Sequence, residues 1–166
     1  MQIRHAQMSD IPALAALERR AFPSAEAATQ PQLKARVTVF GNHFWLLVDD
    51  DDQLISFVNG LVTNQANLTD EMYEQADWHQ EDGTWQMIFS VVTDPDHRKQ
   101  GYASQCLKAA ITDAQMQGRR GLVLTCKDQL IGFYEHFGFV NEGFTGSIHG
   151  GVRWNQLRLT FKESPK

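Results

Sequence analysis

The loop formed by residues 94–104 has the residue types that hold a phosphate group. It lies between a predicted strand and a predicted helix, and the first backbone N–H groups of a helix carry partial positive charge without internal partners. Gly101 and Ala103 keep the approach to these N–H groups open, because neither has a bulky side chain. Arg98 and Lys99 add positive charge. The loop therefore predicts a pyrophosphate site on bare backbone.

The same loop has a second interpretation. One basic residue followed by two spaced small residues also fits a tight strand-to-helix turn that binds nothing. The loop is not a Rossmann fingerprint, which needs Gly-x-Gly-x-x-Gly, and it is not a P-loop, because no Gly-Lys-Ser/Thr follows. On its own residues, the loop leaves both interpretations open.

A second candidate group lies in the aromatic segment Phe-Tyr-Glu-His-Phe-Gly-Phe at 133–139. The phenol of Tyr134 can donate a proton and is otherwise inert. The spacing also fits a core aromatic residue beside Phe133 and Phe137. Both roles stay open on spacing alone.

Together, the two motifs resemble the GNAT superfamily of acetyltransferases. The Arg-x-x-Gly-x-Ala pattern at 98–103 matches its [Arg/Gln]-x-x-Gly-x-[Gly/Ala] coenzyme A signature, and residues 133–139 match its Phe-Tyr-x-x-x-Gly-Phe segment in full. The Glu-Arg-Arg-Ala-Phe segment at 18–22 and the Cys-x-Asp-x-Leu-x-x-Phe-Tyr-x-x-Phe-Gly-Phe run at 126–139 further resemble the arylalkylamine N-acetyltransferase branch. The resemblance extends over most of residues 2–161.

This resemblance implies an acyltransferase that uses acetyl-CoA as its cosubstrate. Backbone N–H groups near Val91 and Val92 are expected to hold the acetyl carbonyl, because the strands of this superfamily splay there. Tyr134 is expected to donate a proton to the leaving CoA thiolate. The residues expected to bind the cosubstrate are Val91, Val92, Thr93, Arg98, Lys99, Gln100, Gly101, Tyr102, Ala103 and Ser104.

At the positions of the general base the chain departs from the branch pattern. Two histidines of that branch align with Met87 and Phe89, and neither side chain can take a proton. We name Glu26 as the candidate base, although a surface glutamate fits its Ser-Ala-Glu-Ala-Ala context equally well. The other candidates for the base are His79, His149 and Glu18, and the residues that can line an apolar acceptor pocket or simply form core are Phe22, Phe57 and Trp85.

Composition limits the class of protein. The chain has 166 residues, 42% of them hydrophobic and 21% charged, which predicts one globular domain over 1–166. The net charge of −5 argues against a nucleic-acid surface. No apolar run has the length of a membrane span, so a cytoplasmic protein is expected. Cys106 and Cys126 lack metal-ligand spacing, so we expect reduced thiols and no metal.

Charge is distributed unevenly along the chain. Acidic residues gather at 49–52 and 70–82, and basic residues gather at 97–99 and 119–120. Two interpretations stay open: the segments are solvated loops, or the basic segments bind an anionic cofactor and the acidic segments bind a cationic substrate. The polar segment 64–84 is long for a loop, which is typical of a lid over a site.

Hydrophobic periodicity predicts an α/β fold. Strands are expected at 2–7, 44–49, 54–63, 85–93, 121–126, 138–144 and 152–161, and helices at 10–20, 30–39, 70–76, 101–117 and 129–137. Ser9 and Thr29 are the expected helix caps. The predicted architecture is a single-domain GNAT fold, in which a mixed, mostly antiparallel sheet has helices on both faces.

The leading hypothesis is a small-molecule N-acetyltransferase that acts on a primary amine. Arylalkylamines fit the resemblance, and polyamines fit the acidic segment. Protein acetylation at an N-terminus or a lysine is an alternative, as is a CoA-binding sensor without turnover. An acceptor pocket closed by residues 22–40 and 64–84 favours the small molecule. Neither monomer nor homodimer is excluded.

Overall fold

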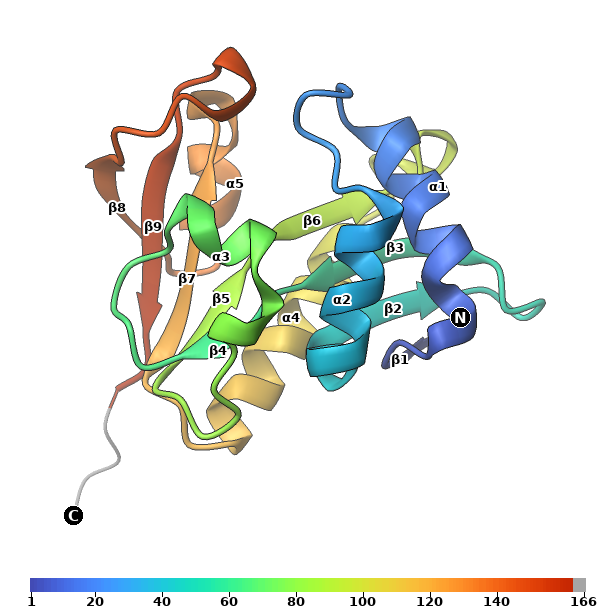
Figure 1. Ribbon diagram of the computed structural model, residues 1–166, viewed down its shortest axis with the longest axis horizontal. Coiled ribbons are helices and arrows are strands. Elements are labelled where there is room, and N and C mark those ends of the chain that lie inside the picture. Colours follow the sequence, from blue (N-terminus) through green and yellow to red (C-terminus); the bar gives the residue numbers. More distant parts are fainter. Residues whose placement is uncertain (163–166) are drawn as a thin grey trace.

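The computed structural model describes residues 1–162, which form two sheets with helices on either side (Figure 1). One sheet has the strand order β1-β2-β3-β6 and the other has the order β4-β5-β7-β9-β8. The strands are β1 Gln2–Arg4, β2 Phe44–Val48, β3 Leu54–Asn59, β4 Val62–Thr63, β5 Trp85–Ile88, β6 Ser90–Thr93, β7 Gly121–Cys126, β8 Val140–Phe144 and β9 Asn155–Thr160. The α-helices are α1 Ile11–Ala21, α2 Gln30–Phe40, α3 Asp70–Glu74, α4 Tyr102–Met116 and α5 Ile131–Glu135.

The predicted strands at 54–63 and 85–93 both break where the chain passes from one sheet to the other. β3 and β6 pair in the first sheet, whereas β4 and β5 pair in the second. The N–H of Phe89 still donates to the carbonyl of Asn59 at 2.7 Å across the break. Gly60 is required there, because a Cβ at this position would collide with the Met87 carbonyl. The prediction of two continuous strands, at 54–63 and 85–93, was therefore wrong, because each is divided into two.

The break separates β6 from β7. β5 pairs with β7 in parallel, with Met87 opposite Val123, while β6 turns away to pair with β3. The other strand pairs within residues 1–162 are antiparallel. This confirms the mixed, mostly antiparallel architecture.

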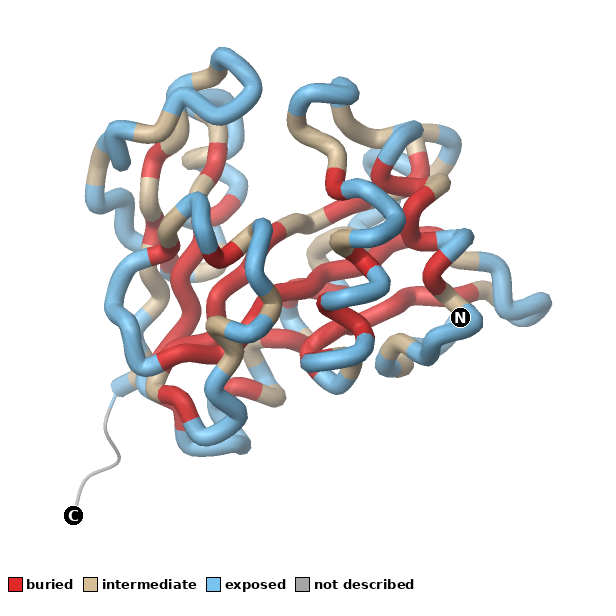
Figure 2. Tube along the Cα trace, viewed as in Figure 1, coloured by how far each residue is buried: buried red, intermediate tan, exposed pale blue. Residues whose placement is uncertain are grey.

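β2 shows how the core is divided between the two faces. All five of its side chains are buried (Figure 2), and their alternation sends them to opposite sides. Phe44, Leu46 and Val48 join the cluster under α1 and α2, whereas Trp45 and Leu47 join the cluster under α4. The helices accordingly cover both faces, as predicted (Figure 1).

The two predicted helix caps differ in outcome. Thr29 caps α2, because its Oγ accepts the N–H of Gln32 at 3.3 Å while Gln32 Oε1 accepts the N–H of Thr29 at 2.9 Å. Ser9 does not cap α1, since it lies inside a short 3₁₀ turn at Met8–Asp10. Asp10 instead accepts the N–H of Gln7 at 2.7 Å, and the α-helix begins after that turn.

Other element boundaries shift by a few residues. The first strand ends at Arg4, α4 lies within its predicted range, and α5 is preceded by a 3₁₀ turn at Asp128–Leu130.

Both cysteines are free and buried, and burial raises the pKa of Cys106 to about 11 and that of Cys126 to about 12. Over residues 1–162, no helix is both long enough and apolar enough to cross a bilayer.

Candidate functional site

Two cavities meet where β6 separates from β7. The smaller has a volume of about 410 Å³ and the larger about 890 Å³. Phe22, Val91, Leu130 and Tyr134 line both cavities. Tyr134 therefore lies where the two cavities adjoin.

The smaller cavity collects the residues predicted to bind the cosubstrate. Those that line it are Val91, Val92, Thr93, Arg98, Lys99, Gly101, Tyr102, Ala103 and Ser104. Gln100 does not line it, and its side chain accepts a hydrogen bond from the Tyr102 hydroxyl at 3.1 Å. The structure thus brings the predicted loop together around one cavity.

The start of α4 is open on the side of this cavity. Gly101 caps the helix with a φ of +79°, and a Cβ there would meet no atom within 4 Å. Lys99 also has a positive φ of 65°. The exposed N–H groups of a 15-residue helix and the neighbouring Arg98 form an environment that suits an anion.

α1 fixes the position of this loop through Arg20. Its guanidinium donates to Asp94 at 2.9 Å and to Asp96 at 3.1 Å. Burial alone raises the pKa of Asp94, but hydrogen bonds from the Asp96 N–H and from Arg20 lower it overall. The loop is therefore held by an ionised Asp94 at neutral pH.

Tyr134 is a buried phenol on α5, with 7% of its surface exposed. Its ring packs at 5.0 Å from that of Phe133 and at 6.0 Å from that of Phe139. Burial raises the pKa of Tyr134 well above its usual value, with a further contribution from Cys126. The hydroxyl therefore stays protonated, as a proton donor requires. Tyr134 belongs to the core and also lines both cavities, so the two interpretations of its spacing are compatible.

The larger cavity is lined by segments that are far apart in sequence. They are residues 18–36, 67–74, 88–91, 124–134 and 142–156, each in part. The predicted closing segments, 22–40 and 64–84, both contribute to this lining.

Two loops approach each other beside this cavity. Lys127 Nζ lies 2.7 Å from Glu26 Oε1. A Cβ on Gly150, which has a φ of +66°, would lie 2.8 Å from Glu26 Cγ. Glu26 is therefore packed against the 149–151 turn and paired with a lysine. Its side chain is only 6% exposed.

Glu18 is the most strongly perturbed carboxylate of the larger cavity. The residue is 3% exposed, and its Oε1 accepts the N–H of Ala28 at 3.1 Å. Its Oε2 has no hydrogen-bond partner in the part of the chain that the structure describes. Burial raises the pKa of Glu18 to about 7, although the Ala28 hydrogen bond and the charge of Arg36 oppose this. A carboxyl group with this pKa can both take and release a proton near neutral pH.

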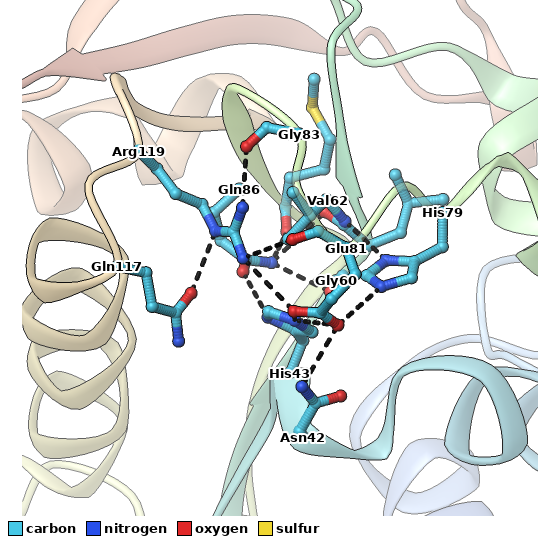
Figure 3. A network of polar contacts seen from close by, with 12 residues as sticks. Asn42, His43, Gly60, Val62, His79, Glu81, Gly83, Gln86, Gln117 and Arg119 are labelled. Carbon is cyan, nitrogen blue, oxygen red and sulfur yellow. Dashed lines mark hydrogen bonds and ion pairs between the residues drawn. The ribbon is translucent and has the colours of Figure 1, made fainter.

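His79 lies outside both cavities, in a polar network (Figure 3). Its Nδ1 accepts the N–H of Val62 at 3.0 Å, so the neutral ring carries its proton on Nε2, which lies 3.0 Å from Glu81. His43 Nε2 lies 2.9 Å from the same carboxylate, and Arg119 lies 3.4 Å from it. The network connects the 79–84 segment to β2 and to the end of α4.

This network also contains three possible metal ligands. Atoms of His43, His79 and Glu81 lie within 4.8 Å of one another. The hydrogen bond from Val62 places a proton, not a lone pair, on the His79 nitrogen that faces the group, and a guanidinium adjoins the carboxylate. These hydrogen bonds argue for a structural network, and the expected absence of a metal stays a prediction.

Of the other residues that the sequence suggested for the acceptor site, some line a cavity and others lie in the core. His149 lines the larger cavity, and Phe22 lines both cavities. Trp85 and Phe57 lie in the core under α1 and α2. Of the two positions that align with histidines, Met87 is fully buried. Phe89 lines the larger cavity.

Sequence reasoning missed two residues of the larger cavity. Arg36 on α2 is 4% exposed, and its guanidinium lies 4.8 Å from the centre of the Phe89 ring. Tyr73 contributes its backbone carbonyl to Arg36 at 2.8 Å and its hydroxyl to Thr125 at 3.1 Å. Arginine is usually exposed on a helix. The sequence therefore gave no signal for this burial.

Comparison with known proteins identifies one sequence family and a shared fold. The sequence model of the Acetyltransferase (GNAT) family matches residues 11–139. No curated protein matches the chain significantly.

Several solved structures share the fold. The GphF GNAT-like decarboxylase in complex with isobutyryl-CoA superposes with a TM-score of 0.85 at 20% identity, covering 98% of this chain and 100% of that one. The loading GNATL domain of CurA from Lyngbya majuscula has a TM-score of 0.82 at 14% identity, covering 96% of each chain. The ribosomal-protein-S18-alanine N-acetyltransferase from Escherichia coli has a TM-score of 0.70 at 17% identity, covering 99% and 96%.

Proposed function

Because the chain belongs to the GNAT family of acetyltransferases, we propose that it transfers the acetyl group of acetyl-CoA to a primary amine of a small molecule. The observation that carries this proposal is the junction of the two cavities at Tyr134. One cavity suits an anionic cosubstrate, and the other contains a carboxyl group able to accept a proton near neutral pH.

The residues that line the smaller cavity support the binding of acetyl-CoA there. The open start of α4 and the side chains of Arg98 and Lys99 would meet its phosphates. The backbone at Val91, which lines both cavities, would lie beside the acetyl group. Backbone N–H groups there can stabilise charge that develops on the carbonyl oxygen.

Tyr134 is proposed as the general acid. Burial raises the pKa of Tyr134, so its hydroxyl carries a proton at neutral pH. This proton passes to the sulfur as the C–S bond breaks and negative charge develops there, and protonation of the sulfur prevents the reverse attack.

Glu18 is proposed as the general base, and Glu26 remains the alternative that the sequence indicated. An alkyl ammonium has a pKa near 10, so the nucleophile must lose a proton before it attacks. Glu18 Oε2 has neither a hydrogen bond nor an ion pair in the described part of the chain. Glu26 Oε1 also makes no hydrogen bond there, but the ammonium of Lys127 lies 2.7 Å from it and neutralises its charge. Glu26 then serves to connect the loops beside the acceptor.

The larger cavity supports a small acceptor. Its lining includes both segments expected to close over a small molecule, and the loop of Glu26 touches the 149–151 turn beside it. A protein acceptor needs an open groove instead. Arylalkylamines suit the aromatic walls of this cavity, and polyamines suit its acidic rim at 70–74. Cytoplasmic location and a monomeric or homodimeric state stay predictions.

The test is release of the CoA thiol from acetyl-CoA in the presence of separate acceptors. The panel contains phenethylamine, tryptamine, spermidine, amino acids and a lysine peptide. Turnover of a small amine confirms the proposal. Selective turnover of the peptide would replace it with protein acetylation. Binding of acetyl-CoA without turnover of any acceptor would favour a sensor.

A further inference from the structure

Two side chains of opposite charge line the larger cavity from neighbouring helices. Glu18 lies on α1 and Arg36 on α2, and both are at least nine-tenths buried. Burial raises the pKa of Glu18 and lowers that of Arg36, and the charge of each opposes the shift of the other. Their helices pack against each other and both residues line the same cavity, yet no ion pair within 4.0 Å joins them in residues 1–162.

Each of these side chains keeps unused bonding capacity. Glu18 Oε2 and Arg36 Nε are buried, and neither has a partner in the described part of the chain. Arginine has five N–H donors, and Arg36 makes one hydrogen bond, from Nη2 to the Tyr73 carbonyl at 2.8 Å. A buried charge that keeps unused hydrogen-bonding capacity is costly, so this arrangement suits a ligand that supplies a cation and an anion together.

We propose that the acceptor is an α-amino acid, whose ammonium group faces Glu18 and whose carboxylate binds Arg36. This inference rests on the proposed acetyl transfer and narrows its acceptor. A polyamine offers no anion to Arg36, and a simple arylalkylamine offers none either. An amine that also carries a carboxylate satisfies both buried charges.

The walls of the cavity favour an aromatic side chain on this amino acid. The aromatic residues that line it besides Tyr134 are Phe22, Tyr73, Phe89, Phe144 and Trp154. An aromatic α-amino acid is an arylalkylamine with a carboxylate on the α-carbon, so it keeps the acceptor type expected from the sequence.

The reaction balances with these residues. The amino nitrogen forms a bond to the acetyl carbon as the C–S bond breaks. The ammonium loses one proton to Glu18 before this attack, and the sulfur receives a proton from Tyr134. The second proton that the nitrogen loses restores the Tyr134 hydroxyl, and Glu18 returns its proton to solvent. The products are the N-acetyl amino acid, free CoA and one proton.

Phenylalanine and phenethylamine test the inference, because they differ only in the carboxylate. We expect wild-type kcat/KM to be about tenfold or more higher for phenylalanine, since hydrogen bonds to charged groups are strong. Arg36→Gln should reduce this ratio to about one. Arg19→Gln, on an exposed residue of α1 outside both cavities, should keep the wild-type ratio.

Wild-type protein alone can overturn the inference. If phenethylamine is acetylated as well as phenylalanine or better, the acetyl transfer stands but the carboxylate site is wrong. If neither is acetylated, calorimetric titration of both compounds into the CoA-loaded protein decides. Tighter binding of phenylalanine, lost in Arg36→Gln, supports the carboxylate site even then. Equal binding, or none, refutes it.

Discussion

Replacement of Glu18 by Gln should stabilise the protein while it slows catalysis. The amide oxygen of Gln can keep the hydrogen bond from Ala28, so the change removes the charge and little else. Because the folded state holds the proton of Glu18 more tightly than the unfolded chain does, wild-type stability falls as pH rises from the unfolded pKa through the folded one.

The magnitude follows from the two pKa values. Burial raises the pKa of Glu18 from 4.5 to about 7. This difference corresponds to a cost of about 3 kcal/mol above pH 7 and of less than about 1 kcal/mol at pH 5. Glu18→Gln should therefore raise the melting temperature by roughly 5–10 °C at pH 8 and by much less at pH 5.

Thermal unfolding at pH 5 and pH 8 measures this effect, with Glu135→Gln as the control. Glu135 is exposed on α5 and lines neither cavity, so its change should alter stability equally at both pH values. In parallel, the loss of a general base should lower kcat/KM about a hundredfold or more. Wild-type kcat/KM should rise through pH 7 as Glu18 loses its proton, and the variant should lack this step. A variant with unchanged stability at pH 8 and a wild-type pH–rate profile would refute both the burial argument and the base.

Three further substitutions probe the rest of the site. Gly101→Val should raise the KM of acetyl-CoA strongly, because a side chain there blocks the open start of α4. The protein should still fold, since the new side chain meets no atom and its positive φ costs only about 1–2 kcal/mol. An unchanged KM would show that this loop does not bind the phosphates. Tyr134→Phe should lower kcat with little effect on acetyl-CoA affinity, and a wild-type kcat would exclude the acid role. Glu26→Gln should weaken the contact with Lys127 and raise the KM of the amine alone. If Glu26→Gln instead changes the KM of acetyl-CoA, the assignment of Glu26 to the acceptor cavity is wrong.

Features set by local interactions were predictable from the sequence. The Thr29 cap with its partner Gln32 depends on residues three positions apart, and the start of α4 depends on one glycine and the basic residues before it. Most residues of the smaller cavity belong to the continuous segment 91–104, so their spacing in the sequence was enough to predict them. Ser9 is not a cap, since it lies inside the 3₁₀ turn in which Asp10 accepts hydrogen bonds from the Gln7 N–H and, at 2.8 Å, from Arg4 of β1.

Features set by contacts between distant segments were not predictable. The strand break at Phe89 depends on the approach of the chain at Gly60, twenty-nine positions earlier, and periodicity within either strand cannot show it. Arg36 resembles an ordinary surface arginine until α2 packs beside Phe89 and Tyr73. Glu18 was a candidate from the sequence, but its burial and its raised pKa follow only from the packing of α1 against the segment at Ala28.

The most direct test of the central claim uses acetyl-CoA with an isotopically labelled acetyl group and phenylalanine as the acceptor. Mass spectrometry then follows the label. The account predicts labelled N-acetyl-phenylalanine in amounts equal to the CoA released, and a much slower reaction in Tyr134→Phe. Release of CoA with the label found only in free acetate, for this and for every other amine of the panel, would contradict transfer to an amine.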